Sequence, residues 1–219
     1  MADDALRERR TVGYESARAD VQGLVPASAR AILELGCASG ALGASLKARQ
    51  GAAVLGVELD QELARDAAGR LDRVVTADAG AFAAGPPPPE APFDCLIAAD
   101  VLEHLADPWA VLRGVAAMLA PGATAVVSLP NVLFWGALAR VVRGRSWPRE
   151  DFGVFDRTHL RWFSTSDAVE LLAQAGFEQV AVHPRYWVEG AALRRREWLA
   201  RTPLRSYLAP QNILTAVKA

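Results

Sequence analysis

A glycine-rich turn between two apolar segments constrains the fold of this chain more than any other feature. Residues 31–35 form a short apolar run that contains Glu34, and the segment that begins at residue 41 carries leucines at positions 42 and 46. Glycines stand at positions 36, 40 and 43. Glycine permits tight turns and the close approach of a ligand to the main chain. The order predicts a strand, a turn and a helix, with backbone N–H groups close to a nucleotide-like ligand.

Further apolar segments have the length of strands and alternate with segments of helical pattern. They occupy residues 54–60, 74–78, 93–99, 125–129, 177–182 and 212–218. Strands that alternate with helices in this way form a parallel sheet that is covered on both faces. The length of 219 residues suits one large domain. We therefore expect a doubly wound α/β fold of about seven strands, in a single domain over residues 1–219.

Two segments fall outside this alternation. Residues 1–26 carry an intermittent apolar pattern and are expected to form one or two cap helices before the first strand. Residues 131–163 insert an apolar helical segment, 132–142, that is flanked by arginines. We expect this insertion to be a lid over the substrate. The alternative is peripheral contact with an anionic membrane or a lipid-linked substrate, because such surfaces bind apolar faces bordered by arginine.

Composition and charge argue against several functions. The formal net charge is −1, which gives no support for nucleic-acid binding. The first residues lack the apolar core of a signal peptide, and no apolar run reaches the roughly 18–20 residues that span a bilayer. Cys37 and Cys95 have no metal-ligand spacing. We therefore expect a cytoplasmic protein with reduced thiols and no bound metal.

Three of the predicted strands have acidic residues at their carboxyl ends, namely Glu34, Glu58 and Asp78. Ligands of doubly wound sheets lie beyond these ends. Glu58 is expected to accept hydrogen bonds from both hydroxyls of a ribose, and Asp78 to meet an adenine amino group. Glu34 is expected to fix the glycine turn through backbone N–H groups. Each acid taken alone is equally explained as a solvated cap at the end of a strand.

Several motifs together carry a specific resemblance. They are Glu34-Leu35-Gly36-Cys37-Ala38-Ser39-Gly40, Gly56-Val57-Glu58-Leu59-Asp60, Asp78, Asp100-Val101-Leu102-Glu103-His104-Leu105 and Leu119-Ala120-Pro121-Gly122-Ala123. Over nearly its whole length the chain resembles class I S-adenosylmethionine-dependent methyltransferases, in the branch similar to ubiquinone-biosynthesis O-methyltransferases and MetW-like proteins. Residues 156–163 resemble members associated with cell-surface polysaccharide and natural-product gene sets. Ala38 and Ala123 stand where the family usually has glycine.

The resemblance implies a Rossmann-like sheet with an antiparallel last strand, S-adenosylmethionine as cofactor and S-adenosylhomocysteine as product. Gly36 and its neighbours would approach the methionine moiety, and Asp100 would lie beside the sulfonium. Tyr14 and Arg18 would close over the cofactor, with Arg18 binding its carboxylate. An exposed helix charge is the alternative for Arg18. The cofactor-binding candidates are Tyr14, Arg18, Glu34, Gly36, Cys37, Ala38, Gly40, Glu58, Leu59, Asp78, Ala79, Asp100 and Val101.

Two histidines are candidate catalytic bases. His104 follows the fourth predicted strand, where it would face the transferable methyl group, and His159 lies in the inserted segment. An imidazole titrates near pH 6.5 and is available as a base at neutral pH. The alternative for His104 is a residue that only shapes the pocket. For His159 it is a structural hydrogen bond within the turn over residues 156–161.

The sequence therefore predicts methyl transfer from S-adenosylmethionine to a small-molecule acceptor, at an oxygen of a sugar or secondary metabolite. One alternative is a non-catalytic MetW-like partner of another enzyme. Another is a nicotinamide-dependent oxidoreductase, which the acid after the third strand and the turn at Pro121 and Gly122 disfavour. The identity of the acceptor, its reacting atom, the pathway and the oligomeric state are left open by the sequence.

Overall fold

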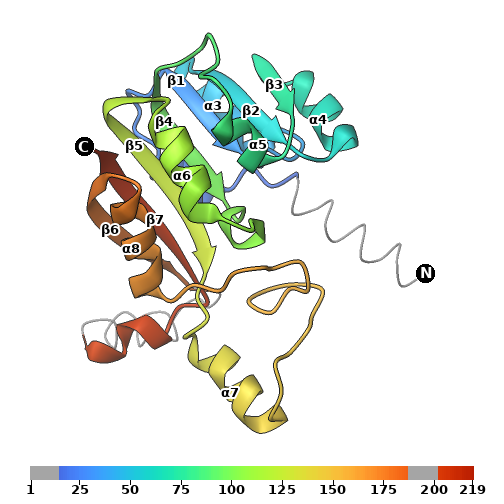
Figure 1. The fold of residues 1–219 in the computed structure, drawn as a ribbon, viewed down its shortest axis with the longest axis vertical. Coiled ribbons are helices and arrows are strands. Elements are labelled where there is room, and N and C mark those ends of the chain that lie inside the picture. The colour runs from blue at the N-terminus through green and yellow to red at the C-terminus, as the bar shows by residue number, and fades with distance from the viewer. Residues whose placement is uncertain (1–14, 187–201) are drawn as a thin grey trace.

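Seven strands form one sheet in the order β3-β2-β1-β4-β5-β7-β6 (Figure 1). The computed structural model describes residues 15–186 and 202–219. Strands β1 to β5 pair in parallel, and β7 runs antiparallel to both β5 and β6. The predicted mixed sheet with an antiparallel last strand is confirmed. The strands are β1 (Ala31–Leu35), β2 (Ala53–Glu58), β3 (Arg73–Thr76), β4 (Phe93–Ala99), β5 (Leu119–Pro130), β6 (Phe177–Arg185) and β7 (Gln211–Lys218).

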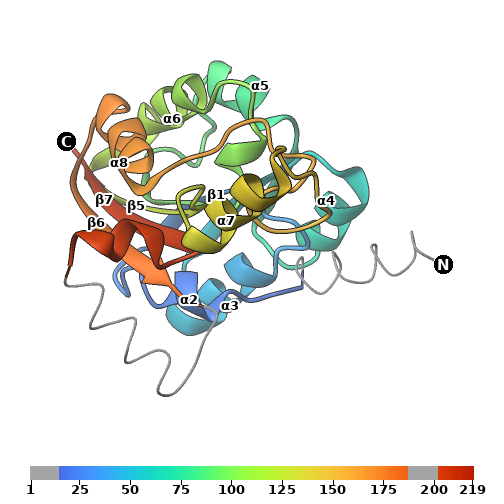
Figure 2. The ribbon, with the colours of Figure 1, turned by 90° about the horizontal axis from the view of Figure 1, so that it is seen from below.

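Helices cover both faces of this sheet, as Figure 2 shows from below. One face buries Val21 of α2 and Leu46 of α3, and the other buries Leu112 of α6 and Leu171 of α8. The two apolar layers make this a doubly wound α/β fold. The helices are α2 (Ala19–Gln22), α3 (Ala41–Gln50), α4 (Gln61–Ala68), α5 (Ala79–Ala84), α6 (Pro108–Ala116), α7 (Trp135–Gly144) and α8 (Thr165–Gln174), with 3-10 turns η1 (Leu102–His104) and η2 (Pro203–Tyr207).

Polar caps move several element boundaries away from the predicted ones. Strand β2 ends at Glu58 because the Asp60 side chain accepts from two backbone N–H groups of α4. Strand β3 ends at Thr76 because Asp78 caps α5, a short helix that the sequence analysis did not predict. Helix α8 is capped by Ser164, which exchanges hydrogen bonds with Asp167. In each case a side chain satisfies N–H groups that the first helical turn leaves open.

Strand β5 also differs from its predicted range, since it begins at Leu119 instead of residue 125. Helix α6 ends at Ala116, so the chain enters the sheet before the turn at Pro121 and Gly122. Leu119 pairs with Phe93 of β4 and Thr124 pairs with Cys95, so this turn lies between the first two pairs of the ladder, where the register shifts. The sequence marked the turn correctly but not the strand that contains it.

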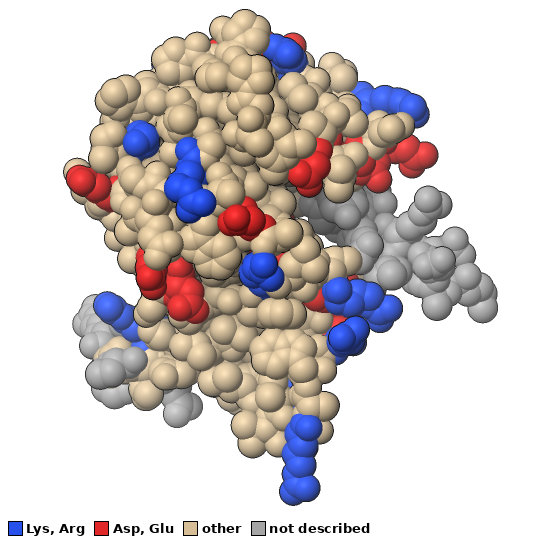
Figure 3. Space-filling view, in the orientation of Figure 1, with Lys and Arg blue, Asp and Glu red and all other residues tan. Residues whose placement is uncertain are grey.

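The insertion between β5 and α8 projects from the carboxyl end of the sheet (Figure 1). It consists of α7 and an irregular segment that returns to the body, where Asn131 pairs with Phe163. On the face drawn in Figure 3, acidic and basic side chains are interspersed, and basic ones extend from this projecting part. The single-domain organisation, with residues 131–163 as a lid, stays a prediction. Most of the predicted N-terminal cap, residues 1–14, lies outside the described residues.

Candidate functional site

A cleft of about 1060 Å³ opens at the carboxyl ends of β1, β2 and β4. Its wall brings together most of the candidates that the sequence provided, namely Arg18, Glu34, Gly36, Cys37, Ala38, Glu58, Leu59, Asp78, Ala79, Asp100, Val101 and His104. Gly40 and His159 do not line the cleft, and Tyr14 lies outside the described residues. The roles of the lining residues toward a cofactor stay predictions, but their convergence on one cleft is a property of the fold.

The glycine turn forms the floor of this cleft under tight steric limits. Gly36 has a φ of +63°, and a Cβ atom there would lie 2.3 Å from Cγ2 of Val101. The N–H groups of Gly36 and Cys37 donate to the Val57 carbonyl oxygen at 2.8 and 3.2 Å. The sequence predicted that backbone N–H groups of the turn lie close to a ligand. This is wrong for the N–H groups of Gly36 and Cys37, because both donate to a carbonyl oxygen of β2. The turn offers a close backbone approach instead.

Gly40 and Cys37 have packing roles in the same turn. Gly40 has a φ of +80°, and a Cβ atom there would lie 3.1 Å from Cα of Ala67, so this glycine lets α3 approach α4. Cys37 is buried, and burial raises the pKa of its thiol, which keeps the sulfur protonated and unreactive at neutral pH. Gly40 was predicted to bind the cofactor, and the structure places it against another helix, outside the cleft wall.

Glu58 ends β2 at the edge of the cleft and tightens the glycine turn. Its Oε2 accepts from the Ala38 N–H at 2.8 Å, and its Oε1 accepts from the Asp60 N–H at 2.9 Å. A carboxylate oxygen has two lone pairs, so each oxygen retains one for a ligand hydroxyl. Ala38 holds a left-handed conformation with a φ of +47°, which this hydrogen bond helps to maintain. The geometry suits the predicted ribose contact.

Asp78 also serves the fold and the cleft together. Its Oδ1 accepts from the Ala81 N–H at 3.0 Å, which caps α5. The alternative offered for a single acid was a solvated cap at the end of a strand; Asp78 is exposed, but it caps the helix that follows β3, and the same carboxylate lines the cleft. The adenine contact of Asp78 stays a prediction.

Glu34 lies beneath the turn as a buried carboxyl group. Burial raises its pKa from the ordinary value of 4.5 to about 8, the Gly43 N–H hydrogen bond opposes this, and the charge of Glu58 adds to it. Its Oε2 has no hydrogen-bond partner among the described residues. Glu34 is therefore largely protonated at neutral pH. The prediction that it fixes the turn through a backbone N–H group agrees with the bond from Gly43.

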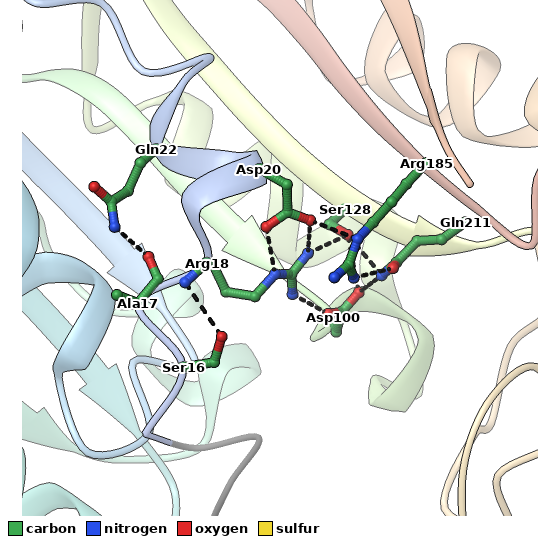
Figure 4. Close-up of polar contacts among 9 residues, drawn as sticks. All are labelled: Ser16, Ala17, Arg18, Asp20, Gln22, Asp100, Ser128, Arg185 and Gln211. Carbon is green, nitrogen blue, oxygen red and sulfur yellow. Dashed lines mark hydrogen bonds and ion pairs between the residues drawn. The ribbon is translucent and has the colours of Figure 1, made fainter. Parts of the chain in front are cut away.

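Arg18 enters the cleft from the N-terminal side and binds Asp100 (Figure 4). Its guanidinium also donates to Asp20 at 3.0 Å and to the Ser128 hydroxyl at 3.2 Å. The predicted alternative, an exposed helix charge, is wrong, because only 14% of the side chain is exposed. Four donor contacts to Asp100, Asp20 and Ser128 occupy the guanidinium fork that was expected to bind a cofactor carboxylate.

The network continues across the sheet to its antiparallel strands. Asp100 accepts from the Ser128 hydroxyl at 2.9 Å and from the Gln211 amide, and Arg185 donates to Gln211 at 2.9 Å and to Asp20 at 2.9 Å (Figure 4). Arg185 lines the cleft, although the sequence did not predict it as a site residue. Arg185 belongs to no recognisable sequence motif. It reaches the cleft because β6, which ends at this residue, lies beside β7.

His104 stands at the end of η1, where the inserted segment crosses the cleft. Its Nδ1 lies 3.2 Å from Thr158 Oγ1 and 3.3 Å from the Thr158 carbonyl oxygen. The Thr158 hydroxyl donates to Asp156 at 2.6 Å, so Thr158 offers His104 only acceptor atoms. Nδ1 therefore carries the proton, and Nε2 of the neutral imidazole keeps its lone pair. His104 is oriented as a base or a ligand.

His159 is buried behind His104, with ring centroids 4.7 Å apart. Its Nδ1 donates to the Val154 carbonyl oxygen at 3.1 Å, so the ring makes a structural hydrogen bond, but to a residue before the turn over residues 156–161 in which the sequence placed that bond. Burial lowers the pKa of His159 and keeps the ring neutral. Its Nε2 lies 4.0 Å from Oε1 of Glu103, whose pKa burial raises well above the ordinary value, with the charge of Asp100 adding to the shift.

The inserted segment supplies cleft residues that the sequence did not identify singly. These are Phe152, Asp156 and Thr158. The Leu160 and Arg161 N–H groups donate to the Glu103 carbonyl oxygen at 2.8 and 3.0 Å, which anchors the segment to η1. The polar pattern of residues 156–161 predicted a turn. The contact with Glu103 that directs this turn toward the cleft joins residues that are distant in sequence.

Among the described helices, none has the length and apolar character that crossing a bilayer requires.

Comparison with known proteins agrees with this architecture. A family model described as a methyltransferase domain matches residues 7–182. A ubiquinone biosynthesis O-methyltransferase of Xylella fastidiosa is 34% identical over 114 residues, which cover 49% of this chain and 44% of that protein. A Mycobacterium tuberculosis protein named "probable S-adenosylmethionine-dependent methyltransferase" is 32% identical over 155 residues, or 71% of this chain and 51% of that protein. The chain thus matches about half the length of these relatives.

Solved structures show the same fold. An S-adenosylmethionine-dependent methyltransferase from Archaeoglobus fulgidus superposes with a TM-score of 0.63 at 18% identity, covering 97% of this chain and 91% of that chain. A magnesium protoporphyrin IX methyltransferase from Synechocystis, solved with bound S-adenosylhomocysteine, gives 0.62 at 16% identity, covering 96% and 85%. Because the family model spans most of the sequence, we conclude that this chain belongs to the methyltransferase-domain family.

Proposed function

We propose that the protein transfers the methyl group of S-adenosylmethionine to an oxygen atom of a small-molecule acceptor, such as a sugar or a secondary metabolite. One observation carries this proposal. A single cleft holds strand-end carboxylates at one end and His104, with residues of the inserted segment, at the other. The carboxylates at the first end can accept hydrogen bonds from the hydroxyls of a nucleoside. At the second end, Nε2 of His104 can accept the proton of an acceptor hydroxyl.

The residues of the nucleoside end fit this cofactor. Glu58 retains lone pairs for ribose hydroxyls, and the missing side chain at Gly36 leaves main chain exposed in the floor. Acidic residues outnumber arginines in the wall, which suits a cationic ligand. S-adenosylmethionine supplies an electrophilic methyl group, so the protein has only to align the acceptor, exclude water and manage one proton.

The acceptor end manages that proton. A hydroxyl oxygen must lose its proton as it takes the methyl group, and the lone pair on His104 Nε2 can receive it. The Thr158 hydroxyl holds the imidazole in this tautomer from behind, and Asp156 holds the hydroxyl. Phe152 and Leu105 add apolar wall beside these polar groups. This division favours an acceptor with a hydroxyl on an apolar or ring-shaped body.

The test is a transfer reaction with deuterium-labelled methyl donor and a panel of free sugars, sugar nucleotides and phenols. The expected result is a product that carries the label on oxygen, located by nuclear magnetic resonance. Label on nitrogen or carbon would contradict the oxygen assignment. Binding of S-adenosylhomocysteine without transfer to any hydroxyl compound would favour a non-catalytic partner instead.

His104→Ala tests the acceptor end separately. We expect turnover to fall by roughly 100-fold, as for loss of a proton acceptor, with little change in S-adenosylmethionine affinity. The matched control is His183→Ala, because His183 binds Thr215 on β7 and does not line the cleft. Equal losses of turnover and affinity in His104→Ala would count against its role.

A further inference from the structure

Arg185 is a cation in the cleft wall that the proposed function does not use. Among the described residues, Arg18 and Arg185 are the two arginines that line the cleft. The Arg18 side chain is 14% exposed, and protein groups occupy its guanidinium. The Arg185 side chain is 39% exposed and has fewer protein contacts. The cleft therefore presents one guanidinium that is accessible to a ligand.

Two contacts hold the Arg185 guanidinium in place (Figure 4). Its Nη1 donates to Oε1 of Gln211 at 2.9 Å, and its Nε pairs with Oδ2 of Asp20 at 2.9 Å. Both partners are themselves held, because the buried Gln211 amide donates to the Ser128 hydroxyl at 2.8 Å and Asp20 accepts from Arg18. A guanidinium that is already oriented loses little conformational freedom when it binds a ligand.

The remaining nitrogen of Arg185 supplies free donors. Over residues 15–186 and 202–219, no group accepts a hydrogen bond from Nη2 of Arg185. A guanidinium is always charged, and its N–H groups form a rigid fork of donors. That fork matches the oxygen atoms of a carboxylate or a phosphate. The accessible edge of Arg185 therefore suits an oxyanion in the cleft.

The sheet order places Arg185 away from the nucleoside end. Glu58 ends β2 and Asp100 follows β4, whereas Arg185 ends β6, on the opposite side of Asp100 from Glu58. The resemblance places the methionine moiety over Gly36, after β1. Because neighbouring strands lie about 4.8 Å apart, the ends of β1 and β6 are roughly 19 Å apart. An anion on Arg185 therefore fits a second molecule better than it fits the carboxylate of the cofactor.

We propose that Arg185 binds a carboxylate or phosphate group of the methyl acceptor. The inference rests on the proposed function, since it names the chemical class of the acceptor for that same cleft: hydroxy acids, acidic sugars or phosphorylated hydroxy compounds. His104 then receives the proton of the reacting hydroxyl, while Arg185 holds the acidic group. Asp20 and Asp100 offset the charges of the two arginines, so binding depends on directed hydrogen bonds and not on a net positive field.

Labelling of the wild-type full chain with phenylglyoxal, which attacks accessible guanidinium groups, tests the site without any acceptor. Mass spectrometry of peptides reads the rate at each arginine. We expect saturating inorganic phosphate or acetate to slow labelling of Arg185 at least tenfold, and sodium chloride of equal ionic strength to leave it unchanged. The anion that protects more strongly distinguishes phosphate from carboxylate recognition. Arg73 is the matched control, because it is 44% exposed, pairs with Glu90 and does not line the cleft.

Two results of the labelling experiment would overturn the inference. One is protection by neither anion, or equal protection of Arg185 and Arg73. The other is protection of Arg185 by S-adenosylhomocysteine alone with no further effect of phosphate or acetate, which would assign the donors to the carboxylate of the cofactor. Neither result requires a variant that folds.

Arg185→Gln tests the same contact in the transfer reaction, with phenol and 4-hydroxybenzoate, and glucose and glucose 6-phosphate, as matched neutral and anionic acceptors. We expect the variant to raise KM for the anionic member at least tenfold with little change in kcat, and Arg185→Lys to recover part of the loss. Circular dichroism checks folding.

The two proposals fail differently. Methyl transfer to neutral acceptors that is equally efficient in the wild type and Arg185→Gln, without preference for an anionic member, removes the inference and leaves the proposed function. Protection of Arg185 by phosphate or acetate without methyl transfer to any acceptor leaves the anion site and removes the proposed function.

Discussion

Arg18 and Asp100 form an ion pair, and both hold left-handed backbone conformations, with φ values of +45° and +60°. Such conformations are costly for residues other than glycine and persist where surrounding contacts fix them. Here the contacts reach from the N-terminal segment to the end of β4, across 82 residues of sequence. The pair closes the wall of the cleft where the sequence analysis placed the sulfonium, so cofactor binding and the order of the N-terminal segment should be coupled.

Arg18→Ala should lower the free energy of unfolding by about 2 kcal/mol, because Asp100 and Asp20 lose charge-assisted hydrogen bonds in a mostly buried setting. Urea denaturation measures this. Arg73→Ala is the control, since its pair with Glu90 is largely exposed and should change stability by less than about 1 kcal/mol. Similar losses in the two variants would show that the Arg18 network contributes no more than a surface pair.

Gly36→Ala should reduce stability by more than the strain of a left-handed alanine alone. Its Cβ atom would meet Val101 at 2.3 Å, whereas a Cβ atom at Gly122, which has a φ of +77°, meets nothing within 4 Å. Gly122→Ala therefore measures the strain, about 1–2 kcal/mol, and the difference between the variants measures the clash. Thermal unfolding makes the comparison. Val101→Ala in the Gly36→Ala background should recover part of the loss, and no recovery would place the clash elsewhere.

Ala38→Gly should stabilise the protein by about 0.5–1 kcal/mol, because glycine holds the left-handed conformation without the penalty that alanine has. The matched change is Ala77→Gly, at a cleft residue without a positive φ, and it should destabilise by about 0.5–1 kcal/mol. Urea denaturation of both variants supplies the signs. Destabilisation of equal size in both would show that Ala38 is not strained.

The stability of the protein should fall as the pH rises from about 5 to about 8 through the buried Glu34. Its carboxyl group binds a proton up to about pH 8 when folded but only up to about 4.5 when unfolded. The folded state thus holds more protons in this window, and the free energy of unfolding decreases with pH, on the order of a few kcal/mol.

Glu34→Gln should remove this part of the pH dependence, because the amide does not titrate. Glu170→Gln, at an exposed site on α8, should leave the slope as in the wild type. Urea denaturation at several pH values measures both. A slope that is unchanged in Glu34→Gln would mean that Glu34 is not the group that holds the proton.

The sequence predicted the sheet and one end of the site well, for a common physical reason. Parallel strands covered on both faces are mostly apolar, so β1 and β4 appear in the sequence as apolar runs that only Glu34 and Asp94 interrupt. The acids Glu58 and Asp78 stand at the end of β2 and just after the end of β3, so they could be placed from the apolar runs of those two strands. The short helix α5 could not be predicted in this way, because its alanine-rich sequence has no apolar periodicity and depends on the cap from Asp78.

The other end of the site depends on contacts that are distant in sequence. His104 was found from its motif, but its tautomer is set by Thr158. Arg185 reaches the cleft because β6 lies at the edge of the sheet beside β7. Local patterns cannot reveal such pairs, since they arise only when the insertion and the last two strands dock.

The binding of S-adenosylhomocysteine in this cleft, with Glu58 on the ribose, is the central claim, and a calorimetric titration tests it most directly. We predict saturable binding to the wild type, no binding of NAD, and at least tenfold weaker binding to Glu58→Gln, because the amide loses a charged acceptor for the ribose hydroxyls. Glu62→Gln, on the exposed first turn of α4, should bind as the wild type does. Equal affinity in Glu58→Gln and Glu62→Gln, or preference for NAD, would contradict the account.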